Sequence, residues 1–128
     1  MKIYKIYCDV YHLTIDLWVG GTEKDLVAEA KKIGQEMMED GTLGTYFDIK
    51  KKDSQEITKR ILWVGKKPKT IVDRAIFVHE IFHMVCAILS YKKILLEFYK
   101  DEKYIQSIEE AYAYLMEFYY RKIMEVLR

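Results

Sequence analysis

The order of hydrophobic patterns along the chain is the feature that most constrains its fold. Strand-like patterns, rich in aromatic and β-branched residues, lie in the first half, at residues 2–19, 45–49 and 57–64. Two long stretches with helical spacing follow, at residues 70–91 and 107–128. Strands grouped ahead of long helices are typical of the α+β class, so the sequence predicts an α+β fold.

Within the first half, residues 2–19 fit either one long strand or a hairpin. Thr22 followed by Asp25 resembles a capping box and predicts the start of a helix. Four apolar residues at helical spacing then predict one apolar stripe: Leu26, Ala30, Ile33 and Met37. Gly41 is the expected stop signal of this helix.

The two long helices have start signals of their own. Thr70 and Asp73 form a capping pattern, and Ser107 with Glu110 forms another, after a loop within residues 92–106. In the first of these helices, six residues at helical spacing predict one apolar face: Ile71, Ala75, Val78, Phe82, Cys86 and Leu89.

Composition narrows the function classes. A length of 128 residues suits a single domain spanning residues 1–128, and a net charge of +1 argues against a nucleic-acid partner. Cys8 and Cys86 are far apart in the sequence, so reduced thiols are expected rather than a disulfide framework. No apolar run reaches the roughly 18 residues of a membrane span, so we expect a cytoplasmic protein without a membrane partner.

The chemistry lies in the sequence His79-Glu80-Ile81-Phe82-His83, an HExxH pattern inside a predicted helix. Residues four apart lie on the same face of a helix, so both imidazoles can reach one metal ion. Glu80 follows the first histidine and can take a proton from water that zinc has acidified. The pattern therefore predicts Zn²⁺ as the cofactor, His79 and His83 as ligands, and Glu80 as general base.

Two other interpretations of this pattern stay open. The histidines could be buried core residues that hydrogen-bond with Glu80 as a partner. The metal could instead be structural, because structural zinc sites usually close with four protein ligands. Cys86, three residues after His83, would then be the candidate fourth ligand, although a small core residue is the commoner role of such a cysteine.

A catalytic site needs a third protein ligand. Glu110 is the first choice and Glu109 the second, because the positive end of a helix starting near Ser107 favours an ionised carboxylate. In the alternative, Glu110 caps that helix together with Ser107 and leaves the metal to Glu109. His12, placed on the first strand, could supply a third imidazole.

These residues resemble the gluzincin type of zincin metallopeptidases, in which HExxH and a glutamate from a later helix hold zinc. The chain is also similar to small uncharacterised HExxH proteins of bacteriophages and bacteria. The matching segments are Trp63-Val64-Gly65, the HExxH pattern, and Glu110-Ala111-Tyr112-Ala113-Tyr114-Leu115. Tyr114 stands where larger gluzincins often have an aspartate that orients a ligand histidine. Tyr112 and Tyr114 are candidates for stabilising an oxyanion.

The resemblance implies a minimal zincin-like fold, with a small twisted sheet that is largely antiparallel or mixed. An N-terminal helix would back this sheet, beside an HExxH helix and a C-terminal glutamate helix. It also implies hydrolysis of peptide bonds, with residues 57–64 as an edge strand that pairs with substrate. The expected partner is a peptide or protein substrate, with a homo-oligomer or a virion or host protein as further possibilities. The alternatives are a non-catalytic phage-type binding or anti-defence module with a structural zinc site, and amide hydrolysis on a non-protein substrate.

Overall fold

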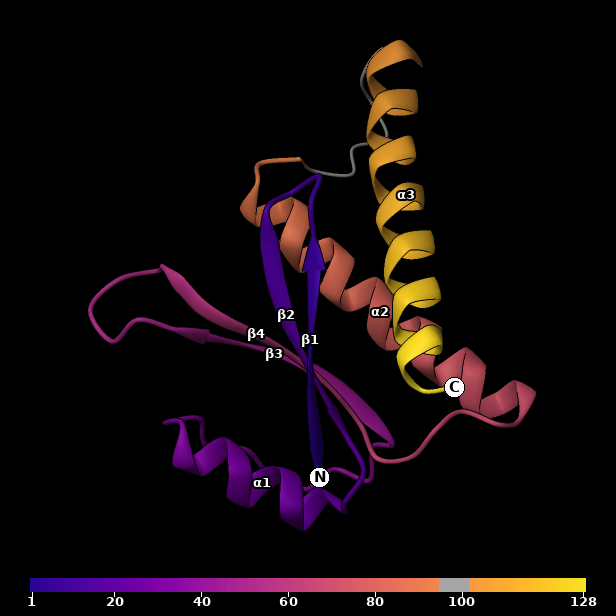
Figure 1. Cartoon of the computed structure of the whole chain (residues 1–128). Helices are drawn as coiled ribbons and strands as arrows, with labels where there is room; N and C mark the ends of the chain where they lie inside the picture. Colours follow the sequence, from indigo (N-terminus) through magenta and orange to yellow (C-terminus); the bar gives the residue numbers. More distant parts are fainter. Residues whose placement is uncertain (95–101) are drawn as a thin grey trace. The chain divides into compact units, whose positions relative to one another are not determined.

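A computed structural model describes the backbone of residues 1–94 and 102–128, and the side chains of residues 1–94 and 107–128. The elements follow the order β1 (Lys2–Cys8), β2 (Leu13–Val19), α1 (Glu23–Lys32), β3 (Gly44–Lys50), β4 (Ile57–Val64), α2 (Ile71–Tyr91) and α3 (Glu102–Val126) (Figure 1). A small mixed sheet with three helices confirms the predicted α+β class. Part of the predicted loop at residues 92–106 lies outside the described residues.

The chain divides into two compact units, Met1–Glu80 and Ile81–Arg128, with the boundary inside α2. The first unit holds all four strands, α1 and the first half of α2. The second holds the remainder of α2 together with α3. The expectation of a single domain over residues 1–128 stays a prediction.

The sheet of the first unit has the strand order β1-β2-β4-β3. β1 and β2 form an antiparallel hairpin, which decides between the two possibilities for residues 2–19, and β3 and β4 form a second one. The hairpins join where residues 16–19 of β2 run parallel to residues 61–64 of β4. Beyond this short seam the hairpins diverge, which gives the sheet a strong twist (Figure 1).

The position of β4 corrects one prediction. β4 pairs with β2 on one side and with β3 on the other, so it is a central strand. Both sides of the β4 backbone are used in the ladder at residues 61–64, so these residues are not available to a substrate strand, whereas in the described sheet residues 57–60 pair with β3 alone. β1 and β3 are the edges of the described sheet.

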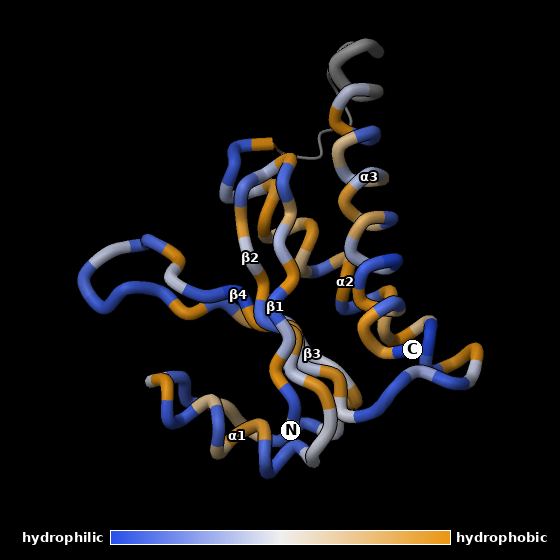
Figure 2. Tube along the Cα trace, in the orientation of Figure 1, coloured by the Kyte–Doolittle hydropathy of each residue, from blue (hydrophilic) through white to orange (hydrophobic). Residues whose placement is uncertain are grey.

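One face of the sheet packs against α1. Trp18 of β2 and Trp63 of β4 are register partners across the seam, and both are buried with Ile61 and with Leu26 of α1. The ring of Phe47 meets Trp18 edge-on, with centroids 5.9 Å apart. Four partly buried residues pack against this cluster: Ile33, Met37, Phe47 and Ile49. The predicted apolar stripe of residues 26–37 therefore faces the core, and Figure 2 shows hydrophobic and hydrophilic residues alternating along α1.

Both ends of α1 are fixed by local bonds. The predicted capping box is present: the Asp25 N–H donates to the Thr22 hydroxyl oxygen at 3.3 Å, and the Thr22 N–H donates to the Asp25 carboxylate at 2.7 Å. The helix ends at Lys32 rather than near Gly41, because Gly34 adopts a φ of +86°. This left-handed glycine reverses the chain, so the helix ends nine residues before the predicted signal.

In the second unit, the start of α3 also differs from its prediction. The helix begins at Glu102, so Ser107 lies inside it and the Ser-x-x-Glu pattern is not a cap. Among the described side chains of α3, the buried ones keep a helical spacing: Ile108, Tyr112, Leu115, Phe118, Tyr119 and Ile123. A capping pattern marks a helix start only where the preceding backbone is non-helical, and here helical backbone precedes it. Among the described residues, no helix combines the length and apolar character needed to cross a membrane.

Candidate metal centre

The candidate centre lies on α2, whose first turn is held in place by its cap. The backbone N–H groups of Lys69 and Thr70 each donate to Asp73 Oδ2 at 3.2 Å. The Asp73 N–H donates back to the Thr70 hydroxyl oxygen at 3.0 Å, which confirms the predicted capping pattern. Backbone donation from Lys69, and then from Thr70, lowers the pKa of Asp73 below its usual value. An ionised Asp73 therefore anchors the start of the helix that carries the histidines.

The face of α2 that is buried differs from the predicted apolar face. Its buried residues are Phe77, Ile81, Met84, Val85, Ile88 and Leu89. Of the six residues predicted to share the apolar face, Leu89 is buried, whereas Ile71, Val78 and Phe82 are exposed. Most positions of α2 are apolar, so the sequence contains two apolar stripes and helical spacing alone does not distinguish them. The consequence is that the face carrying His79 and His83 is exposed.

His79, Glu80 and His83 form a compact group. Each offers one ligand atom, an imidazole nitrogen or a carboxylate oxygen, and these atoms all lie within 4.8 Å of one another. Both histidines are exposed and Glu80 is half-buried. Two imidazoles and a carboxylate are ligands that zinc prefers, so the donor set fits this metal. The interpretation of the two histidines as buried core residues is wrong, because both are exposed.

Glu80 is placed against the start of the edge strand β3. A Cβ atom built on Gly44 would lie 3.5 Å from the Cγ of Glu80 and 3.2 Å from the carbonyl oxygen of Trp63. The second of these distances is shorter than an ordinary contact, so a larger residue at this position would displace its neighbours. Gly44 thus allows the backbone of β3 to lie directly beside the stem of Glu80, at one side of the candidate centre.

The remaining candidate ligands do not join this group within the described part of the chain. His12 lies in the turn between β1 and β2 with a φ of +50°, rather than on a strand, and its Nδ1 is 3.1 Å from the Tyr7 hydroxyl oxygen. Cys86 is partly buried, and burial raises the pKa of its thiol.

Glu109 and Glu110 are both exposed on α3, and neither belongs to the group among the side chains that are described. Because Ser107 is inside the helix, Glu110 is not engaged as its capping partner. For the same reason the positive end of the helix does not lie at Glu110 and does not favour a metal-binding carboxylate there. Glu110 as third ligand, with Glu109 as alternative, stays a prediction.

The two tyrosines considered for the oxyanion differ in their surroundings. Tyr112 is buried, and its hydroxyl donates to the carbonyl oxygen of Ile94 at 3.2 Å. The hydroxyl proton that would stabilise an oxyanion is therefore already donated in a hydrogen bond. Tyr114 is exposed, and its ring stacks on Phe118 with centroids 6.2 Å apart. Of the two, Tyr114 has the more accessible side chain and is the better candidate.

A comparison of two variants tests the third ligand. We expect Glu110→Ala to lower zinc affinity by about 100-fold or more, since losing a direct ligand should cost at least as much as losing an outer-shell partner. Glu109→Ala is the matched control, because it removes an equally exposed carboxylate from the adjacent position. Titration with a competing chelator measures both affinities. A larger loss for Glu109→Ala would assign the ligand to Glu109.

No protein-family model matches the chain, and neither the curated proteins nor the solved structures compared with it contain a significant match. The resemblance to gluzincins therefore depends on the sequence patterns alone.

Proposed function

We propose that this protein is a zinc-dependent metallopeptidase. The observation that supports the proposal is the group of two histidines and one glutamate on the exposed face of α2, with ligand atoms within 4.8 Å of one another. Bound there, zinc would acidify a water molecule and polarise the carbonyl group of a substrate. The proposed substrate is a peptide or protein, and Glu110 is the proposed third ligand.

The residues of the chain then have separate tasks. The imidazoles of His79 and His83 hold the metal from successive turns of one helix. The carboxylate of Glu80 accepts a proton from the attacking water and passes it to the nitrogen of the leaving amine. Half-burial of Glu80 against Gly44 restricts the positions of this carboxylate, which helps it to stay within reach of the reacting atoms.

Digestion of a peptide library tests this function. Purified protein should contain one zinc ion per chain and should cleave extended, unstructured peptides. A chelator should abolish cleavage, and added zinc should restore it, because the acidified water depends on the metal. A chain that binds no transition metal after expression with ample zinc would contradict the proposal.

A second candidate function is a binding module in which the zinc is structural. The apolar side chains of Val78 and Phe82, exposed on α2 beside the histidines, favour this alternative because they could contact a protein partner. The two functions give different results in the same digest. A binding module would carry zinc and leave every peptide intact.

A further inference from the structure

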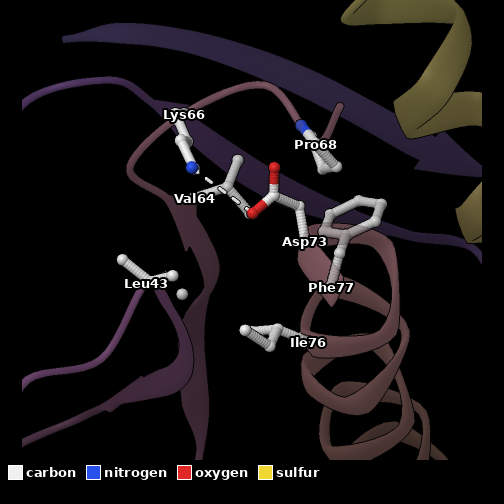
Figure 3. A pocket seen from close by; sticks show the side chains of 8 residues that line it. Leu43, Val64, Lys66, Pro68, Asp73, Ile76 and Phe77 are labelled. Atoms are coloured by element: carbon white, nitrogen blue, oxygen red, sulfur yellow. Dashed lines mark ion pairs between the residues drawn. The ribbon is translucent and has the colours of Figure 1, made fainter. Parts of the chain in front are cut away.

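A small cavity lies in the first unit where the start of β3, the end of β4 and the first turns of α2 meet (Figure 3). Its apolar walls are Leu43, Val64, Pro68, Ile76 and Phe77. The free volume is about 20 Å³ for the centre of a water-sized sphere. Since a single water needs roughly 10–15 Å³ by this measure, the cavity has room for one methyl-sized group.

The charged groups at the cavity are already paired with each other. Lys66 Nζ lies 3.3 Å from Asp73 Oδ1, and Figure 3 shows this ion pair at the side of the cavity. The other carboxylate oxygen of Asp73 accepts the N–H groups of Lys69 and Thr70, as described for the helix cap. Lys66 and Asp73 therefore keep their partners when an apolar group fills the cavity. A polar group would find both carboxylate oxygens of Asp73 already paired with other donors.

Gly44 connects this cavity to the candidate centre. It lines the cavity, and a Cβ atom built on it would be 3.5 Å from Glu80 Cγ. The backbone on either side of it is fixed, because the Gly65 N–H donates to the Leu43 carbonyl oxygen at 3.1 Å and the Thr42 hydroxyl donates to the Gly44 carbonyl oxygen. The cavity and Glu80 are thus neighbours separated by a residue without a side chain.

We propose that this cavity receives the side chain of the substrate residue next to the cleaved bond and restricts it to the size of alanine. The inference rests on the proposed peptidase function and adds a substrate preference to it. Ile76 and Leu43 both line the cavity, and neither side chain is fully buried in the core. Their side chains therefore limit the size of the group that can enter. A leucine at the same substrate position would exceed the free volume.

Peptides that differ only at this position test the proposal. Wild type should cleave the alanine peptide better than the leucine peptide by roughly tenfold or more, the usual effect of a methylene group that a site rejects. Ile76→Ala should reverse or remove this preference by enlarging the cavity. Ile49→Ala is the matched control, because Ile49 is equally half-buried but packs against Trp18 and Trp63 on the α1 side of the sheet.

A binding measurement separates this inference from the proposed function. Acetyl-alanine amide and acetyl-leucine amide are titrated into wild type while the methyl resonances of Leu43, Val64, Ile76 and Ile49 are followed by NMR. Selective shifts of the first three with the alanine compound would support the cavity, even if no peptide were cleaved and the peptidase proposal failed. Equal responses to both compounds, no response to either, or cleavage with the same preference in wild type and Ile76→Ala would overturn the cavity proposal.

Discussion

Replacing Glu80 with glutamine is expected to leave folding and zinc content nearly unchanged while lowering peptide hydrolysis by about 100-fold or more. Glutamine keeps the length of the side chain and fits the same space beside Gly44, but an amide is not a base. The expected loss corresponds to the removal of general-base catalysis, which typically contributes 10²–10⁴ in rate. Turnover of a cleaved library peptide and zinc content per chain are the two measurements.

The zinc measurement also examines another role for Glu80. Its carboxylate oxygen lies within 4.8 Å of the histidine nitrogens, so Glu80 could itself bind the metal. In that case Glu80→Gln would weaken zinc binding together with turnover, and the assignment as general base would be wrong. Glu117→Gln on α3 is a suitable control, since it makes the same chemical change at a described glutamate outside the group. Full activity of Glu80→Gln would contradict the role of Glu80 as general base, whereas a zinc-loaded wild type as inert as Glu80→Gln across the library would favour the binding module.

Replacing His83 or His79 with alanine is expected to lower zinc affinity by more than about 100-fold and to abolish hydrolysis. Each variant removes one of the two imidazoles that the helix places together. Both side chains are exposed, so the folded chain should tolerate the change, as surface substitutions usually alter stability by less than about 0.5 kcal/mol. Metal analysis after dialysis, with circular dichroism to confirm folding, measures the effect.

The third histidine of the chain provides the control for these variants. His12 lies in the β1–β2 turn, where its Nδ1 is paired with the Tyr7 hydroxyl. We expect His12→Ala to keep its zinc. A loss of zinc as large as that of His83→Ala would instead make His12 a ligand and would replace Glu110 in the proposed set.

Several features encoded by neighbouring residues match their predictions, although the capping pattern at Ser107 and the stop signal at Gly41 do not. The capping boxes at Thr22 and Thr70 and the strand at residues 57–64 depend on side chains within a few positions of each other. The proximity of His79 and His83 likewise follows from helix geometry, because a spacing of four residues fixes it. The α+β class could be inferred from the order of the strand and helix patterns along the chain, because each pattern is itself local.

Features that depend on distant parts of the chain were not predictable in this way. The stripe of α2 that is buried is decided by what covers the helix, and the sequence of α2 contains two suitable stripes. β4 is central because β2, which lies far away in sequence, pairs with it. The identity of the third ligand is not predictable for the same reason. Helical spacing relates Glu110 to its neighbours on α3 and not to the histidines of α2.

The short seam between β2 and β4 has a consequence for the order of folding. Each hairpin closes locally, on a timescale of roughly 1–10 μs, whereas the seam joins Asp16 to Ile61 across 45 residues and has a larger entropic cost of loop closure. The two hairpins should therefore form before they join. The two tryptophans of the chain, Trp18 and Trp63, are register partners at this seam, so their fluorescence would report the joining step directly.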